Sequence, residues 1–153
     1  MYRSEEMTRK LASEIVKWKY EKPYDLYNYD VDDIEELMSG SYHGILNENH
    51  TLVGYFCTGK EAQVPAGSLL RAYDDFSFID IGLGMRPDLT GKGKGHAFLS
   101  FIISQVGLAN LRLTVATFNK RAIKLYEKVG FVQIGDSFTN GRTDFQVMTN
   151  RCE

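Results

Sequence analysis

The stretch that decides the fold of this chain reads FSFIDIGLGMRPDLTGKGKGHA and covers residues 76–97. Its first half, 76–85, is rich in aromatic and β-branched residues and predicts a strand, which Pro87 ends. Three glycines then alternate with lysines, directly before an apolar segment whose spacing predicts a helix from about residue 93 to 106. The expected order is therefore a strand, a glycine-rich turn and a helix.

The glycine-rich turn has the composition of an anion site. Gly91, Gly93 and Gly95 stand at alternate positions and leave one side of the turn without side chains. Backbone N–H groups can then point together at a ligand oxygen, and the N-terminus of the following helix adds its positive end. Lys92 and Lys94 add charge that fits a polyphosphate better than a single carboxylate. The alternative is a flexible turn with two solvated lysines.

The sequence completes neither of two other phosphate-binding motifs. The dinucleotide fingerprint G-x-G-x-x-G is completed neither from Gly82 nor from Gly93. A Walker A loop is approached at residues 54–60, but Glu61 stands where the magnesium-binding Ser or Thr belongs. Residues 54–60 also belong to a predicted hairpin strand with no helix after it. Neither type of nucleotide site is expected.

The rest of the chain alternates between helical and strand patterns. Thr8 is a plausible N-cap for a first helix that Pro23 closes, and Gly40 ends a short acidic second helix. The other expected elements are a hairpin of strands 42–46 and 51–57, a strand 111–116, a helix 119–128 with Gly130 as C-cap, and strands 131–134 and 144–148. This order predicts one α+β domain over residues 1–153, with a mixed, mostly antiparallel sheet and helices on both faces.

Composition and net charge restrict the kinds of molecule that the chain is expected to bind. With 18 basic and 20 acidic residues the net charge is -2, so no overall attraction to nucleic acid or to an anionic membrane is expected. The N-terminus carries charges throughout, and no apolar stretch approaches the roughly 20 residues that cross a bilayer. Cys57 and Cys152 form no metal-binding or disulfide pattern, and the three histidines are scattered. A cytoplasmic protein without a bound metal is expected.

Two motifs carry a family resemblance. Residues 80–95, DIGLGMRPDLTGKGKG, resemble the strand and loop of the GNAT superfamily of N-acetyltransferases, whose loop Gln/Arg-x-x-Gly-x-Gly/Ala binds the pyrophosphate of acetyl-CoA. Residues 113–131, LTVATFNKRAIKLYEKVGF, resemble the downstream strand and helix of that family, which end in Tyr-Glu-Lys-x-Gly-Phe. Residues 76–134 match closely, and the first 70 fit by element order. Thr90 stands where the family usually has Gln or Arg. We expect this difference to remove one side-chain contact with the pyrophosphate, which is bound mainly by backbone N–H groups.

The resemblance implies a GNAT, or acyl-CoA N-acyltransferase, fold with splayed central strands. The pantetheine of acetyl-CoA would insert between the strand ending at Met85 and the strand ending at Ala116. A backbone N–H near Gly84 and Met85 would hold the oxyanion of the reaction. The residues implied in binding acetyl-CoA are Gly84, Met85, Thr90, Gly91, Lys92, Gly93, Lys94, Gly95, His96, Ala97, Asn119, Arg121 and Tyr126.

Three side chains receive roles in catalysis by family correspondence. Asp80 stands where relatives often carry a glutamate, so it is a candidate general base; a structural strand aspartate is the alternative. Asn119 and Tyr126 are seven residues apart, about two helical turns, and share one helix face. Asn119 would hydrogen-bond the pantetheine, and it also suits a helix N-cap. Tyr126 would protonate the departing sulfur, and its alternative is packing on Phe131.

The implied function is transfer of the acetyl group from acetyl-CoA to a primary amine, by direct attack in a ternary complex. The tyrosine- and aspartate-rich stretch 24–33 corresponds to the connection that walls the acceptor site in this family, and aromatic rings with carboxylates suit a cationic amine. A plain acidic helix entry is the alternative. The acceptor, a small molecule or a protein amine, is not determined, and homodimers are common in such folds. A non-catalytic acyl-CoA-binding regulatory module is the second hypothesis.

Overall fold

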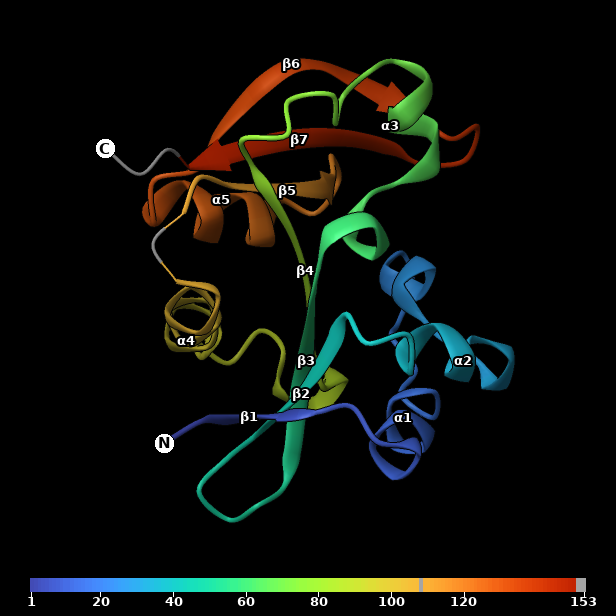
Figure 1. Cartoon of the computed structure of the whole chain (residues 1–153), viewed down its shortest axis with the longest axis vertical. Coiled ribbons are helices and arrows are strands. Elements are labelled where there is room, and N and C mark those ends of the chain that lie inside the picture. Colours follow the sequence, from blue (N-terminus) through green and yellow to red (C-terminus); the bar gives the residue numbers. More distant parts are fainter. Residues whose placement is uncertain (108, 151–153) are drawn as a thin grey trace. The chain divides into compact units, whose positions relative to one another are not determined.

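The strands form a mixed sheet of seven strands. A computed structural model describes residues 1–107 and 109–150. The strand order is β1-β2-β3-β4-β5-β7-β6 (Figure 1), with antiparallel ladders for β1–β2, β2–β3, β5–β7 and β7–β6 and a parallel ladder for β4–β5. The predicted α+β class with a mixed, mostly antiparallel sheet is confirmed.

Packing divides the chain into two compact units. The first unit comprises Met1–Cys57 and Leu83–Gln105, and the second comprises Thr58–Gly82 and Val106–Glu153. The strand β4 (Ile79–Met85) starts in the second unit and ends in the first. The remaining elements are β1 (Arg3–Glu6), α1 (Arg9–Ile15), η1 (Tyr24–Tyr27), η2 (Val31–Asp33), α2 (Ile34–Leu37), β2 (Tyr42–Leu46), β3 (Leu52–Thr58), η3 (Gly59–Ala62), α3 (Pro65–Leu69), η4 (Pro87–Leu89), α4 (Gly95–Val106), β5 (Leu111–Ala116), α5 (Lys120–Lys128), β6 (Val132–Thr139) and β7 (Asp144–Asn150).

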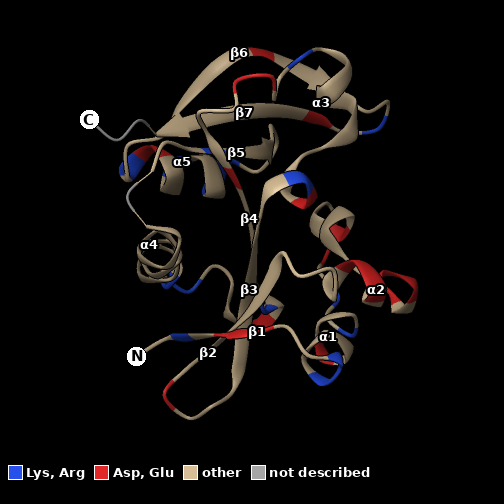
Figure 2. Cartoon of the chain, viewed as in Figure 1, with Lys and Arg blue, Asp and Glu red and all other residues tan. Residues whose placement is uncertain are grey.

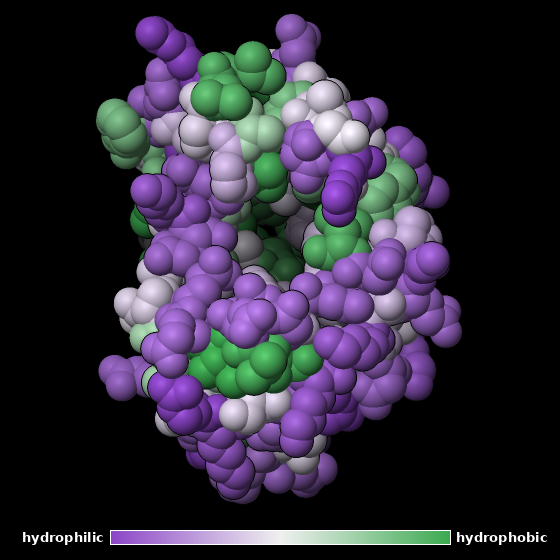
Figure 3. All heavy atoms as spheres, turned by 90° about the vertical axis from the view of Figure 1, so that its right-hand side faces the viewer, coloured by the Kyte–Doolittle hydropathy of each residue, from purple (hydrophilic) through white to green (hydrophobic). Residues whose placement is uncertain are grey.

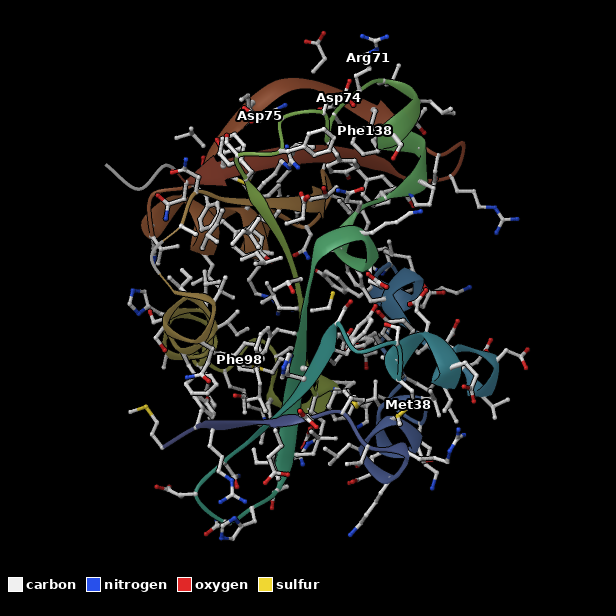
Figure 4. The ribbon with its side chains drawn as sticks, in the orientation of Figure 1. Met38, Arg71, Asp74, Asp75, Phe98 and Phe138 are labelled. Carbon is white, nitrogen blue, oxygen red and sulfur yellow. The ribbon has the colours of Figure 1, made fainter. Side chains whose placement is uncertain are left out.

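In the first unit, helices cover both faces of the strands. Successive side chains of a strand point to opposite faces. Gly54 of β3 faces α4, where a Cβ would overlap the ring of Phe98, the residue labelled on α4 in Figure 4. Its neighbour Tyr55 points the other way and stacks on Trp18, in the segment that follows α1. Figure 1 shows the same arrangement, with α4 on one side of β2 and β3 and α1 and α2 on the other.

In the second unit, aromatic residues of the antiparallel strands form the core. Phe138 of β6 lies opposite Phe145 of β7, and their rings stack at 5.7 Å between centroids. Tyr73 from the loop before β4 joins this cluster. The helix α3 approaches so closely that a Cβ on Gly67 would lie 2.9 Å from atoms of Phe138 and Tyr73. The glycine therefore sets how near α3 packs to β6.

The central parallel pair is short. Ile79 of β4 lies opposite Leu111 of β5, and Asp80 lies opposite Arg112. Among the described residues of the second unit the ladder stops there, although β5 continues to Ala116. Within the described part of the second unit, the pairing of β4 with β5 is thus limited to these two pairs of residues.

Several element boundaries differ from the prediction. The first helix was expected to run to Pro23 but ends at Ile15, because the chain beyond it leaves the helix to place Trp18 against Tyr55. The strand predicted from Phe76 begins at Ile79, and α4 begins at Gly95. The elements β1 and α3 were not predicted, because neither the polar sequence of β1 nor the small residues of α3 give a periodic apolar signal.

The structure bears only in part on the expectations about cysteines, metal sites and membrane spans. Cys57 is a buried thiol on β3, and Cys152 lies outside the described residues. In the described part of the chain, no helix combines the length and apolar character of a membrane span, and no cluster of three or more metal-ligating side chains is found. The single-domain organisation remains a prediction.

Candidate functional site

The glycine loop lies in the first unit, between β4 and α4. Gly91 and Gly93 adopt φ values of +71° and +77°, in the left-handed region that favours glycine. Both residues are exposed, and a Cβ on Gly93 would meet no atom within 4 Å. The backbone conformation thus requires both glycines, and at Gly93 crowding plays no part.

The N-terminus of α4 adds donors to this loop. The N–H of Phe98 donates to the carbonyl of Lys94 at 3.1 Å. The N–H groups of Gly95, His96 and Ala97 belong to the first turn, where a helix offers no carbonyl acceptor of its own. Lys92 and Lys94 are exposed next to them, and Figure 2 shows the ribbon coloured for basic residues on the loop before α4. Backbone donors, a helix N-terminus and two cations are the groups that the predicted anion site requires.

The peptide that leads from β4 into the loop is held on both sides. The hydroxyl of Tyr20 donates to the carbonyl of Met85 at 2.6 Å. The N–H of Arg86, which belongs to the same peptide group, donates to the carbonyl of Val53 at 2.8 Å. Tyr20 was not among the predicted site residues, because no local pattern reveals a contact between residues 65 positions apart.

Side chains within the turn fasten it further. The guanidinium of Arg86 donates to the carbonyl of Leu52 and, through Nε at 2.7 Å, to the carboxylate of Asp88. The hydrogen bond from Arg86 holds the pKa of Asp88 below its usual value. The hydroxyl of Thr90, the position that departs from the GNAT motif, donates to the carbonyl of Pro87 at 2.7 Å. Thr90 thus stabilises the turn itself.

A close approach explains Gly84. A Cβ at this position would overlap the ring and the hydroxyl of Tyr55. The end of β4 therefore lies directly against an aromatic side chain, with no room for a side chain of its own. The ring of Tyr55 therefore packs against the backbone at Gly84, next to the N–H groups that are predicted to stabilise an oxyanion.

Tyr55 packs with Tyr29 and Tyr42, and Tyr20 lies near enough to Tyr29 to interact with it electrostatically. We call these four residues, Tyr20, Tyr29, Tyr42 and Tyr55, the tyrosine cluster. The hydroxyls of Tyr29 and Tyr42 lie 3.0 Å apart, and the hydroxyl of Tyr42 donates to the carboxylate of Glu36 at 3.1 Å. Burial raises the pKa of Tyr29 to about 12 and raises the pKa of the other three further. The cluster therefore consists of neutral hydroxyl groups over the physiological pH range.

The acidic stretch next to the cluster is used in part to start a helix. The carboxylate of Asp30 accepts the N–H of Asp32 at 2.9 Å, and the carboxylate of Asp33 accepts the N–H of Asp30 at 2.8 Å. This capping box confirms the helix-entry alternative for Asp30 and Asp33. Figure 2 shows acidic residues concentrated on α2 and the turn before it. Figure 3 shows one face of the protein, on which hydrophilic side chains surround a hydrophobic patch.

In the second unit, Asp80 is a buried ion-pair partner. Its Oδ1 accepts the Nε–H of Arg112 at 2.6 Å, and its Oδ2 accepts a second N–H of Arg112 at 2.8 Å. The side-chain amide of Gln63 donates to Oδ2 at 2.9 Å. Asp80 and Arg112 are 5% and 3% exposed. This geometry favours the structural alternative for Asp80 over the general base.

Further contacts explain why the pair is stable inside the protein. The guanidinium of Arg112 lies 5.3 Å above the ring of Tyr73 and 5.4 Å above the ring of Phe78. It also donates to the carbonyl of Asp75 at 3.0 Å. The hydrogen bond to Asp80 raises the pKa of Arg112 above its usual value. The sequence held a signal for this pair, since Arg112 is a charge in an otherwise uncharged strand, but its partner is revealed only by the register.

The helix α5 carries the remaining predicted residues. The Oδ1 of Asn119 accepts the N–H of Ala122 at 3.3 Å, so Asn119 is the N-cap that the sequence offered as one of its roles. Tyr126 is buried and packs edge-on against Phe131, with ring centroids 6.1 Å apart. Arg121 is exposed. The ligand-binding roles of these residues remain predictions.

The predicted site residues thus fall into two groups. Gly84, Met85 and the loop from Thr90 to Ala97 belong to the first unit. Asp80, Asn119, Arg121 and Tyr126 belong to the second. In the first group, the peptide between Met85 and Arg86, which forms two hydrogen bonds, connects the end of β4 to the glycine loop. In the second group, Asp80 pairs with Arg112, and Asn119 and Tyr126 lie at the start and within the helix α5.

The family of the chain follows from sequence comparison. The profile of the Acetyltransferase (GNAT) family matches residues 7–131. This range covers most of the chain, so the chain belongs to the GNAT family of acetyltransferases. No match is found among curated proteins.

Solved structures share the fold at low sequence identity. A chimera of the spermidine N-acetyltransferase SpeG from Vibrio cholerae and hSSAT is 19% identical and has a TM-score of 0.70, over 98% of this chain and 95% of its own. The phosphinothricin acetyltransferase (Pat) from Sinorhizobium meliloti, solved in complex with AcCoA, is 18% identical with a TM-score of 0.67, over 99% of this chain and 88% of its own. At these identities the likeness establishes the GNAT fold.

Proposed function

We propose that this protein is an N-acetyltransferase that transfers the acetyl group of acetyl-CoA to a primary amine by direct attack in a ternary complex. The observation that carries the proposal is the exposed glycine loop, with Gly91 and Gly93 at positive φ directly before α4, in a chain of the GNAT family. The relatives add support, since one is a spermidine N-acetyltransferase chimera and another was solved with AcCoA.

The loop residues fit the anionic part of acetyl-CoA. The N–H groups from Gly91 to Ala97 would bind the pyrophosphate, with Lys92 and Lys94 adding charge. Arg121 is exposed on α5, and we assign it to the adenosine phosphate. Asn119, which caps α5 through its Oδ1, would also hydrogen-bond the pantetheine.

The reaction needs three contributions from the chain. The amine nitrogen forms a bond to the thioester carbonyl carbon, and backbone N–H donors near Gly84 and Met85 stabilise the oxyanion, an effect commonly worth about 3 kcal/mol. The carbon–sulfur bond then breaks, and the hydroxyl of Tyr126 donates its proton to the departing thiolate. The products are the N-acetyl amine and coenzyme A.

The proton that the attacking amine loses needs a separate acceptor. Both oxygens of Asp80 already accept hydrogen bonds, from Arg112 and Gln63. We therefore assign the removal of this proton to solvent water, and Asp80 to holding the start of β4. A primary amine has a pKa of ~10, so raising the pH toward that value is expected to raise the rate.

Calorimetric titration with acetyl-CoA, followed by an acetylation assay on a panel of amines, tests the proposal. The panel holds a polyamine, an amino acid, an aminoglycoside and a lysine-containing peptide. Binding of acetyl-CoA together with release of coenzyme A in the presence of one amine is the expected result. Binding without turnover on the whole panel would favour the regulatory acyl-CoA-binding module, and absence of binding would exclude both.

A further inference from the structure

We infer that Tyr20 is a positioning residue for the peptide that connects β4 to the glycine loop. The inference rests on the proposed function, because it assigns Tyr20 to the same acetyl-CoA-binding loop. It also goes beyond that function, since this tyrosine belongs to neither of the two sequence motifs that carry the family resemblance.

The peptide between Met85 and Arg86 is held at both of its polar atoms. Its carbonyl accepts the hydroxyl of Tyr20 at 2.6 Å, and its N–H donates to the carbonyl of Val53 at 2.8 Å. A peptide group is planar, so two hydrogen bonds from different segments fix its orientation. The Val53 bond comes from the neighbouring strand β3, whereas the Tyr20 bond comes from outside the sheet.

Tyr20 is itself held in place. Its backbone N–H donates to the side-chain Oδ1 of Asn28 at 2.8 Å, and its ring packs edge-on against Tyr27 with centroids 6.4 Å apart. Lys19 fastens the same segment, since its Nζ donates to the carbonyls of Val16 and Tyr29. The hydroxyl of Tyr20 therefore acts from a rigid base and not from a mobile loop.

The hydrogen bond from Tyr20 matters because this peptide lies between β4 and the glycine loop. Met85 is the last residue of β4 and Arg86 the N-cap of η4, which leads into Thr90 and the glycines. Any rotation of the peptide changes both the N–H donors proposed for the oxyanion and the start of the anion-binding loop. Without the hydroxyl, the Val53 bond is the one hydrogen bond to this peptide's polar atoms that remains among the described residues. The side-chain contacts of Arg86 and Thr90 still hold the turn that follows, but not the peptide itself.

The tyrosine cluster provides a matched control. Tyr29→Phe removes a hydroxyl from the same cluster, but the hydroxyl of Tyr29 bonds that of Tyr42 and not the end of β4. In Tyr20→Phe, the amide of Arg86 is expected to exchange its hydrogen about tenfold faster, because it loses the support of the fixed peptide. In Tyr29→Phe this amide is expected to exchange at the wild-type rate.

Kinetics and binding give a second readout. Tyr20→Phe is expected to lower kcat about tenfold and to weaken acetyl-CoA binding several-fold, with the KM of the amine unchanged within about twofold. Tyr29→Phe is expected to leave the affinity for acetyl-CoA unchanged within about twofold. Asn28→Ala, which keeps every tyrosine but releases the backbone of Tyr20, is expected to reproduce the loss in weaker form.

The outcomes separate this inference from the proposed function. Equal exchange rates of the Arg86 amide in wild type, Tyr20→Phe and Tyr29→Phe would overturn the positioning role, whatever the activity. Equal losses of acetyl-CoA affinity in Tyr20→Phe and Tyr29→Phe would overturn it too, since they would reflect the cluster as a whole. If wild type binds no acetyl-CoA, the proposed function fails, while hydrogen exchange still decides whether Tyr20 holds the peptide.

Discussion

Asp80 and Arg112 face each other in the short parallel ladder between β4 and β5, joined by two hydrogen bonds of 2.6 and 2.8 Å. Both side chains are almost fully buried, and Gln63 occupies a further lone pair of the carboxylate. A buried pair of this kind is costly to break, because the remaining charge has no partner and little solvent. The pair therefore gives Asp80 a structural role with consequences that can be measured.

Replacing Asp80 by Asn is expected to lower the free energy of unfolding by about 3 kcal/mol, since it leaves the buried Arg112 without a counter-charge. Urea unfolding measures this change. The kcat of the folded variant, measured at low temperature, is expected to stay within a few-fold of wild type. Asp74→Asn is the control, because Asp74 forms an exposed pair with Arg71 in the same unit (Figure 4) and its loss should leave stability unchanged. A stable Asp80→Asn protein without turnover would return Asp80 to the role of general base.

Replacing Gly93 by Ala is expected to weaken acetyl-CoA binding at least tenfold, because the loop would leave its left-handed conformation or place a methyl group on its ligand side. Calorimetric titration measures the dissociation constant. Gly135→Ala is a matched control, since Gly135 has a φ of +70° against +77° for Gly93 and neither Cβ would meet an atom within 4 Å. Equal affinity in the two variants would mean that the glycine loop is an ordinary turn.

Replacing Tyr126 by Phe removes the proposed acid and keeps the ring that packs on Phe131. We expect kcat to fall by about two orders of magnitude with unchanged stability and acetyl-CoA affinity. Steady-state kinetics and thermal unfolding provide the two measurements. Full turnover in a variant that still binds acetyl-CoA would assign the proton transfer to another group and leave Tyr126 as a core residue.

The tyrosine cluster predicts a loss of stability at alkaline pH. An unfolded tyrosine has a pKa of ~10, whereas burial raises the pKa of Tyr29 to about 12. Between these two values the folded state holds the proton that the unfolded state has lost. The stabilisation is therefore complete below pH ~10 and declines as the pH rises toward the folded pKa. Urea unfolding from pH 8 to 12 should show a shallower decline in Tyr29→Phe than in wild type, and identical slopes would contradict the assignment.

Replacing Gly84 by Ala is expected to destabilise the first unit by about 1–3 kcal/mol, because the new methyl group overlaps the ring of Tyr55. Urea unfolding of Gly84→Ala, Tyr55→Leu and the double variant tests the cause. If the overlap is responsible, the double variant loses less stability than the sum of the single variants. Strict additivity would show that the cost of Gly84→Ala arises elsewhere.

Features set by local chain conformation were predicted well from the sequence. The N-caps Thr8 and Asn119, the end of α5 before Gly130 and the turn at Gly91 and Gly93 depend on residues within a few positions of one another. Such features leave a readable spacing in the sequence. The strand-to-helix junction on which the family resemblance rests is of the same local kind.

Features set by distant contacts were missed or assigned differently. The role of Asp80 depends on Arg112, 32 positions away, and the contact of Tyr20 with Met85 spans 65 positions. The first helix was predicted too long because Trp18 finds a better partner in Tyr55 than a further helical turn would provide. In each case a tertiary contact outweighs the local conformational preference of the residue. The spacing of apolar residues along the chain does not reveal which distant residue makes that contact.

The division of the chain also limits how the protein can be dissected. Because the first unit is assembled from Met1–Cys57 and Leu83–Gln105, and the second from the intervening and following residues, the chain passes from one unit to the other three times. No single cleavage or fusion point separates one intact unit from the other, so neither can be produced as a simple fragment. Changing the preference of such a protein for its acceptor therefore calls for grafts of short segments, such as residues 24–33, and not for the exchange of halves.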